Sequence, residues 1–340
     1  MATKVELLTA FKSAIKPDVA KFSQADANSA AINAILETYN LKDASTREIL
    51  ARQPEVFAIV EQAIEELLPA AITDIMGGYA EVQTFARDAE PLFTIKKVGK
   101  ARARLSIVEG ARGGIYRARR LDNKNMTVPV KVMTVGTFVT LEEILLGTLS
   151  LAELMDNIAQ GFVEQIYIKT VEAMRTAKTL APAANIKSGN GVVAADLDAL
   201  IRIAAAYGDP IIMGFRSAVA KINNQTGWTG VTPNVAQADV DEIRKQGFVG
   251  LFHGTPVVEL PNYLIDETNS GFVFKEGDLF ILPTAAKPVK IAMKGDLHIE
   301  ETAHPSGSKE QNAHRLVGVG LMLANNVCVY TDTSITGGKY

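Results

Sequence analysis

The spacing of hydrophobic residues predicts a helical first part of the chain. In residues 1–80 Ala, Leu, Glu and Lys dominate, and the apolar positions follow helical spacing without strand-like alternation. Pro54 is favourable at a first helical position and Gly77 follows Met76, so the longest helix is expected over residues 54–76. Large apolar residues are too few for an independent core. This part is therefore predicted to be a helical arm or appendage.

Alternating apolar and polar residues predict strands between residues 94 and 139. The alternation is clear in residues 102–107 and 127–132, and glycines lie between the two runs. Apolar residues are too few to bury both faces of such strands. We therefore expect a β-excursion, such as a long hairpin, that projects from the body.

A long helix is predicted next. Ser150 and Glu153 have the spacing of a capping box, and the helical pattern continues to about Lys178. At 1.5 Å per residue, such a helix is roughly 40 Å long, which suits a structural spine. Four apolar residues of its stripe are expected to pack against strands around residues 316–330, namely Leu154, Ile158, Phe162 and Ile166.

The remaining chain mixes helix and strand patterns. Helices are predicted over residues 195–206, 215–223 and 236–246. Strands are predicted over residues 210–214, 256–260, 279–283, 289–293, 296–300, 316–322 and 327–331. Residues 302–312 are polar and contain Pro305 and Gly307, so they are expected to form a loop.

Charge is distributed unevenly along the chain. The net charge is −3, but residues 95–131 hold eleven Lys and Arg against two acidic residues, a local charge of +9. Such a segment can be a solvated strand face, a phosphate-binding surface, or a surface that docks on an acidic partner. Because the rest of the chain is net acidic, another copy of the chain supplies a matching surface, and self-association is the favoured interpretation. The candidate contact residues are Arg102, Arg104, Arg117, Arg119 and Arg120.

No motif for catalysis, cofactor binding or metal binding is present in the sequence. A phosphate-binding loop, a dinucleotide fingerprint and a serine-nucleophile elbow are absent, and the four histidines match no standard metal spacing. Cys328 lies between Val327 and Val329, a pattern typical of a small buried side chain. Neither a signal peptide nor a membrane span is expected. The sequence therefore predicts a protein without enzymatic activity, cofactor or metal.

The order of predicted elements resembles that of one protein family. A helical arm, a basic β-excursion, a long helix, an α/β unit and terminal strands follow one another, as in the major capsid proteins of tailed bacteriophages with the Hong Kong 97-type fold. The similarity extends over about residues 93–333. It is clearest in four stretches, residues 140–178, 196–213, 254–260 and 296–301.

This resemblance implies an α+β fold with four parts. They are a helical N-arm (1–90), an extended β-loop (91–139), a peripheral domain with the long spine helix (140–188 and 289–340) and an α/β axial domain (189–288). The helical N-terminus is expected to stay on the subunit. The loop at residues 302–312 would lie at the peripheral tip, where Lys309 and Glu310 would contact other capsomers.

The resemblance also implies self-assembly into pentamers and hexamers of an icosahedral shell that encloses double-stranded DNA without sequence-specific binding. Portal, scaffolding and decoration proteins would be partners, and the protein would occur in the virion capsid and, during assembly, in the host cytoplasm. The basic excursion would lie across a neighbouring subunit. Its arginines would meet carboxylates of that neighbour's long helix, such as Glu153, Asp156, Glu164 and Glu172.

Two alternatives remain open at the level of sequence. An encapsulin-type compartment shares the capsid fold and would be favoured by a groove for a cargo peptide. An α/β enzyme with an unrecognised site would be favoured by a deep apolar pocket with convergent polar groups.

Overall fold

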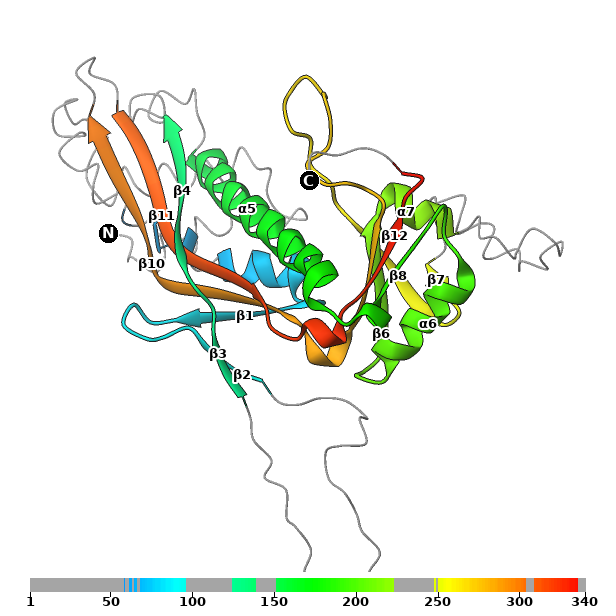
Figure 1. Cartoon of the computed structure of the whole chain (residues 1–340). Coiled ribbons are helices and arrows are strands. Elements are labelled where there is room, and N and C mark those ends of the chain that lie inside the picture. Colours follow the sequence, from blue (N-terminus) through cyan, green and yellow to red (C-terminus); the bar gives the residue numbers. More distant parts are fainter. Residues whose placement is uncertain are drawn as a thin grey trace, which may run out of the picture.

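The computed structural model describes residues 68–95, 124–138, 151–222, 250–303 and 309–335, together with residues 58, 61, 62, 64, 65 and 248. These residues form a mixed helix and sheet structure, in agreement with the predicted α+β class. A four-stranded sheet and a six-stranded sheet lie on either side of one long helix (Figure 1). A small two-stranded sheet adjoins the four-stranded sheet.

The four-stranded sheet has the strand order β1-β10-β11-β4. β1 runs parallel to β10, and the other neighbours are antiparallel. Apolar side chains alternate along these strands, so one face of the sheet joins the main core. The strands are β1 (Ala80–Phe85), β4 (Lys131–Phe138), β10 (Val289–Ala303) and β11 (Lys309–Leu321).

The long helix α5 (Leu151–Leu180) packs on this face, which confirms the helix predicted from residue 150 to about 178. Ile158, Phe162 and Ile166 are buried in one cluster with side chains of β11 and β12 (Cys328–Asp332), as expected from their shared helical stripe. Leu154 lies on α5, but its side chain is outside the described residues.

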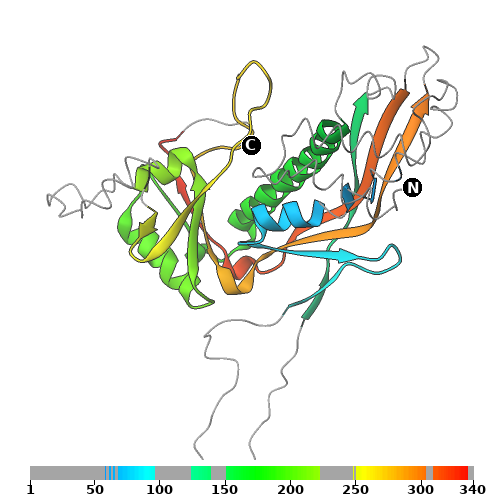
Figure 2. The ribbon, with the colours of Figure 1, turned by 180° about the vertical axis from the view of Figure 1, so that it is seen from behind.

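A second helix, residues 68–76, lies beside α5 in the same core (Figure 2). Ile64, Leu68, Ile72 and Met76 recur every four residues, and all are fully buried. The helix ends before Gly77, as predicted, but the strand β1 that follows was not predicted. Residues expected to form an arm thus supply a helix and a strand to the body. The preceding arm residues, 1–57, lie outside the described residues.

The six-stranded sheet has the order β5-β12-β9-β6-β8-β7. The helices α6 (Ala194–Ala205) and α7 (Arg216–Lys221) share a buried apolar cluster with it. These helices and the strands near residues 210, 256 and 279 confirm the predictions, whereas the helix expected over residues 236–246 lies outside the described residues. The strands are β5 (Ile186–Gly189), β6 (Pro210–Phe215), β7 (Leu251–Phe252), β8 (Thr255–Leu260), β9 (Asp278–Pro283) and β12 (Cys328–Asp332). Short 3-10 helices are η1 (Ala183–Asn185), η3 (Thr284–Ala286) and η4 (Ala324–Asn326).

The position of β12 differs from the sequence-based division of the chain. The division groups residues 289–340 with the long helix, but β12 pairs with β9 and β5 in the six-stranded sheet. The Tyr330 hydroxyl donates to the Gly191 carbonyl at 2.6 Å and so fixes the end of this strand. The chain therefore returns to the six-stranded sheet after completing the four-stranded one, a pairing that alternation alone does not specify.

The prediction of two strands over residues 289–293 and 296–300 was wrong, because β10 is one strand of 15 residues. Its register with β11 shifts between Lys294 and His298, and Gly295 has a positive φ of 68° there. A glycine tolerates this conformation and lets the strand bend without ending.

The prediction of a polar loop over residues 302–312 was wrong at both of its ends. β10 continues to Ala303 and β11 begins at Lys309, with Ala303 paired to Lys309 and Glu300 paired to Asn312. Antiparallel pairing satisfies the backbone groups whatever the polarity of the side chains, so a polar sequence can still form strand. Lys309 and Glu310 therefore lie on a strand rather than in a loop.

The base of the predicted β-excursion is a hairpin-like pair of strands. β2 (Leu92–Ile95) pairs antiparallel with β3 (Lys124–Thr127), and Phe93 and Val128 pack on Ala292 of β10. The run expected to be one strand over residues 127–132 is interrupted at Pro129, which has no backbone N–H for pairing. Residues 96–123, including the strand expected over residues 102–107, lie outside the described residues.

Candidate subunit-contact surfaces

The predicted contact residues divide into three groups in the structure. The arginines at positions 102, 104, 117, 119 and 120 lie outside the described residues. Four others lie on described helix or strand backbone, but nothing is described of their side chains; they are Glu153 and Asp156 on α5 and Lys309 and Glu310 on β11. Glu164 is half-buried and Glu172 is exposed, both on α5. The pairing of arginines with acidic residues thus stays a prediction.

Glu164 marks the place where α5 contacts the segment that follows β8. Tyr167, three residues further along the same helix, stacks edge-on against Tyr263 with ring centroids 5.6 Å apart. Its hydroxyl donates to the Pro261 carbonyl at 2.6 Å. Burial raises the pKa of both tyrosines, and the nearby Glu164 charge raises the pKa of Tyr263 further. Both tyrosines thus remain protonated and anchor this segment to the helix.

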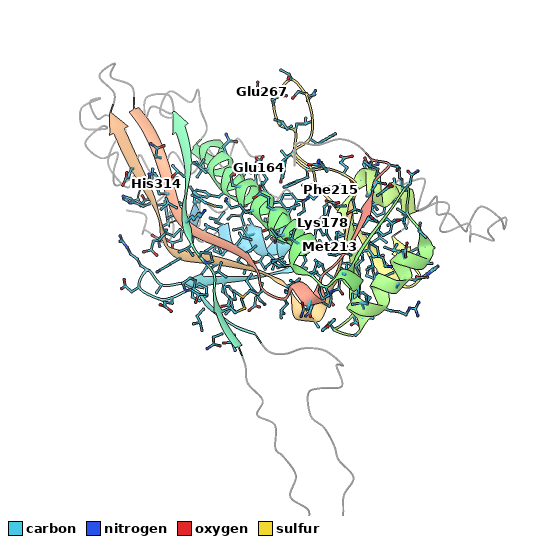
Figure 3. All side chains as sticks on the ribbon, viewed as in Figure 1. Glu164, Lys178, Met213, Phe215, Glu267 and His314 are labelled. Carbon is cyan, nitrogen blue, oxygen red and sulfur yellow. The ribbon has the colours of Figure 1, made fainter. Side chains whose placement is uncertain are left out.

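The anchored segment is a projecting hairpin that sequence analysis missed. We call residues 261–275 the apolar hairpin. In Figure 1 it stands clear of both sheets, and Glu267 marks its tip in Figure 3. The side chains of Leu264, Ile265 and Phe272 are exposed to 46%, 41% and 41%. A signal for it was present, since two apolar runs flank a turn-forming stretch with Asp266 and Gly271.

A buried carboxylate joins α5 to the six-stranded sheet. Asp278 of β9 is 2% exposed, and Oδ2 lies 3.1 Å from Arg175 Nε while Oδ1 contacts Lys178 Nζ. The hydroxyl of Thr331 donates to the same carboxylate at 3.2 Å. Figure 3 labels Lys178 on α5 and Met213 and Phe215 on β6 of the six-stranded sheet. Opposite charges and a hydrogen bond thus compensate the burial of Asp278 and hold the helix end against the sheet.

A cluster of imidazoles and carboxylates lies beyond the bend of β10. The pairing of β1 with β10 ends at Phe85 and Lys294, so among the described residues this part of β10 has no strand on that side. There, Glu61 Oε1 accepts a hydrogen bond of 2.5 Å from the Ile299 backbone N–H. His298 Nδ1 lies 3.5 Å from the same carboxylate oxygen. On the neighbouring strand β11, His314 is the register partner of His298, and its Nε2 lies 3.7 Å from Glu300 Oε2. Glu61 therefore occupies the strand edge that β1 leaves open.

Glu65 lies one helical turn after Glu61. It is close to Asp296 and to the buried guanidinium of Arg315. The pKa of Glu65 is raised by burial, by a hydrogen bond to Asp296 and by the negative charges of Asp296 and Glu61, while the charge of Arg315 opposes this shift. The pKa of Arg315 is lowered by its burial, although both carboxylates oppose that change. Glu65 is thus more readily protonated in the folded protein than in the unfolded chain.

We expect Glu65→Gln to remove one source of pH dependence. A carboxyl whose pKa is raised by folding stabilises the protein at pH values below its ordinary value of 4.5, and this contribution is lost as the pH rises through the higher folded-state pKa. The unmodified protein should therefore lose stability relative to the variant as the pH rises from about 4.5 toward neutral. Thermal unfolding at a series of pH values tests this, with Glu172→Gln on the exposed side of α5 as control. Parallel pH profiles for Glu65→Gln and the unmodified protein would contradict it.

Cys328 is buried, as predicted, and burial raises the pKa of its thiol to about 12. In the part of the chain that the structure describes, no group of three or more His, Cys, Asp or Glu side chains is arranged to hold a metal ion. No helix among those same residues is long and apolar enough to cross a membrane.

The fold of the chain is similar to that of a capsid protein in a solved structure. One similar structure is the capsid of a native GTA particle. Its capsid protein is 12% identical to this chain, and the match covers 76% of this chain and 90% of the GTA protein, with a TM-score of 0.50. The mature capsid protein of bacteriophage PhiM1 is 12% identical over 76% of this chain and 87% of its own, with a TM-score of 0.49. An encapsulin, SrpI from Synechococcus elongatus PCC 7942, is 10% identical over 75% and 88%, with a TM-score of 0.42. The first of these similarities shows that the fold is that of a capsid subunit.

The family itself is identified by sequence. The family model described as "SPbeta prophage-derived putative capsid protein YonB" matches residues 6–329, and the chain belongs to this family. No curated protein matches the chain. The expected class, a structural major capsid protein of a bacteriophage, is thus confirmed.

Proposed function

We propose that the chain assembles into pentamers and hexamers of an icosahedral shell that encloses double-stranded DNA. The observation that carries this proposal is the family match over residues 6–329 together with the capsid-type fold. The protein acts as a structural element of the virion capsid and performs no catalysis. It assembles in the host cytoplasm, and portal, scaffolding and decoration proteins are its further partners.

The fold supports a role for each sheet in this proposal. The six-stranded sheet with α6 and α7 forms the axial domain, and it includes β5 and β12 from outside residues 189–288. The four-stranded sheet and α5 form the peripheral domain, with α5 as the spine helix. Asp278 with Arg175 and Lys178 links the two domains within one subunit.

Charge supports contacts between copies more than it supports tight DNA binding. The basic segment, residues 95–131, carries +9 in a chain with a net charge of −3. DNA packed in a shell must later leave it, and a strongly cationic interior would hold the phosphates through counterion release. In the proposed capsomer, Arg102, Arg104, Arg117, Arg119 and Arg120 instead contact acidic groups of a neighbour, with Glu153, Asp156 and Glu164 as candidates. Lys309 and Glu310 contact the adjoining capsomer.

The test is to express the full chain and examine it by electron microscopy and analytical ultracentrifugation. Uniform polyhedral particles are the expected result, and co-expression with the phage's other head proteins should yield particles that contain DNA. A chain that stays monomeric at all concentrations and in the presence of those proteins would overturn the proposal. Particles that instead take up an enzyme through a terminal peptide would assign the shell to the encapsulin class.

A further inference from the structure

We propose that the apolar hairpin is a docking element that binds an exposed apolar surface on β7 and β8 of a second copy of this chain. This second surface, which we call the edge patch, consists of Leu251, Pro256 and Val258. The inference rests on the proposed self-assembly. The two surfaces would form one of the contacts between copies.

The apolar hairpin is held in one shape by its own hydrogen bonds. The backbone N–H groups of Val273 and Ile265 donate to the carbonyls of Tyr263 and Gly271, each at 2.9 Å. At its base, the Asn262 amide donates to the Phe274 carbonyl at 3.0 Å and accepts from the Phe274 N–H at 3.1 Å.

The tip of the hairpin is organised around one carboxylate. Asp266 accepts hydrogen bonds from the backbone N–H groups of Thr268 and Ser270, both at 3.1 Å, and from both hydroxyls. These bonds lower the pKa of Asp266 to about 2, so the carboxylate stays charged and the turn stays closed at neutral pH. A segment fixed in this way loses little conformational entropy on binding.

Three of the side chains that the hairpin exposes are large and apolar. Leu264 and Phe272 face each other across the hairpin in an isolated β-bridge, and Ile265 follows Leu264 in the chain. Among the described residues, nine large apolar side chains are strongly exposed, and three of them lie in these nine hairpin positions, 264–272. Such a concentration is typical of an interaction surface rather than of scattered surface residues.

The edge patch has matching character. β7 is the last strand of the six-stranded sheet, and Leu251 is the register partner of Pro256. Val258 lies two residues further along β8, on the same face by strand alternation, and it and Leu251 are exposed to 40% and 60%. The patch and the hairpin thus account for five of the nine strongly exposed apolar side chains in the described part of the chain.

The two surfaces lie on different parts of the subunit. β8 runs from the edge patch directly into the hairpin, and the hairpin continues away from the sheet on the side of α5 (Figures 1 and 2). Within one subunit the hairpin therefore points away from the patch. A contact from the hairpin of one copy to the patch of the next is head-to-tail, and its repetition forms a ring when the rotation between successive copies closes, and an open filament when it does not. A ring of copies is the unit that the proposed function requires.

The first test replaces the apolar side chains of each surface. Leu264→Ser with Phe272→Ser, and separately Leu251→Ser with Val258→Ser, should each leave the thermal unfolding transition in place and abolish ring and particle formation. The matched control is Ile75→Ser with Leu180→Ser, which removes two exposed apolar side chains outside both surfaces and should assemble normally. Normal assembly of either test pair would overturn the inference. If the unmodified chain itself forms no oligomer, the proposed function fails and the inference fails with it.

The second test identifies the contact directly. One preparation carries only Leu264→Cys and another only Leu251→Cys, and the two are mixed under assembly conditions and treated with copper phenanthroline as oxidant. A disulfide-linked dimer should form in the mixture and not in either preparation alone, because a head-to-tail contact brings the two different positions together. The native Cys328 is buried and does not compete. Particles that assemble from the mixture without this dimer would refute the contact while leaving self-assembly intact.

Discussion

Phe162→Ala should lower the free energy of unfolding by about 3–5 kcal/mol, the usual range for removing a fully buried aromatic side chain. Phe162 is fully buried in the middle of α5. Its cluster includes Val317 of β11 and Val329 of β12, which belong to different sheets. The cavity would therefore open where the helix contacts both halves of the subunit, and neither half can close it without moving the other.

Urea denaturation of the unassembled subunit, followed by circular dichroism, measures this change. The matched control is Glu172→Ala on the exposed face of the same helix, which should change stability by less than about 0.5 kcal/mol. A decrease in the free energy of unfolding as small as that of the control would show that the described packing of α5 is wrong. Since the four predicted core residues came from helical spacing alone, the experiment also tests that prediction.

Elements with a complete local pattern were predictable from sequence. α5 has a capping box and an apolar stripe, and its described bounds differ from the prediction by one or two residues. β9 and β6 are short apolar runs, and both were predicted nearly at their observed bounds. In these cases the burial pattern and the local backbone preference agree, so short stretches of sequence suffice.

Elements that depend on a distant partner were not predictable in the same way. β1 alternates only over Ala80–Gln83, too short a run to predict a strand, and it pairs in parallel with β10, more than 200 residues later. The polar ends of β10 and β11 are strands because they pair with each other and, for β11, with β4. Here the hydrogen bonds come from tertiary structure, and side-chain polarity gives no sign of them.

The surfaces were harder to predict than the fold for a related reason. Asp278 is separated by 100 residues from Lys178, so the buried ion pair cannot be derived from either local sequence. The apolar hairpin contains turn-forming residues that any surface loop would have. Its significance depends on the exposure of Leu264, Ile265 and Phe272, which only the folded structure gives.

Reversing the charge of Arg117, Arg119 and Arg120 together to Glu should block capsomer formation and leave the monomer folded. The substitution changes the local charge of residues 95–131 from +9 to +3 and places three carboxylates against the acidic surface proposed for the neighbour. Each exposed ion pair contributes only about 0–1 kcal/mol. The three pairs recur at every subunit of a ring, however, and like charges at the same positions repel, so the effect on assembly exceeds that on one subunit.

Sedimentation of the triple variant and its thermal unfolding separate assembly from folding. Replacement of the same three residues by Lys is the matched control, since it keeps the charge and should retain at least partial assembly. High salt should weaken assembly of the unmodified chain in the same direction, because charges are screened over about 10 Å at 0.1 M ionic strength. If the triple Glu variant instead forms normal shells that fail only to retain DNA, the arginines face the packaged phosphates. In that case the basic segment belongs to the interior of the shell, and the contact between subunits depends on apolar surfaces such as the hairpin and the edge patch.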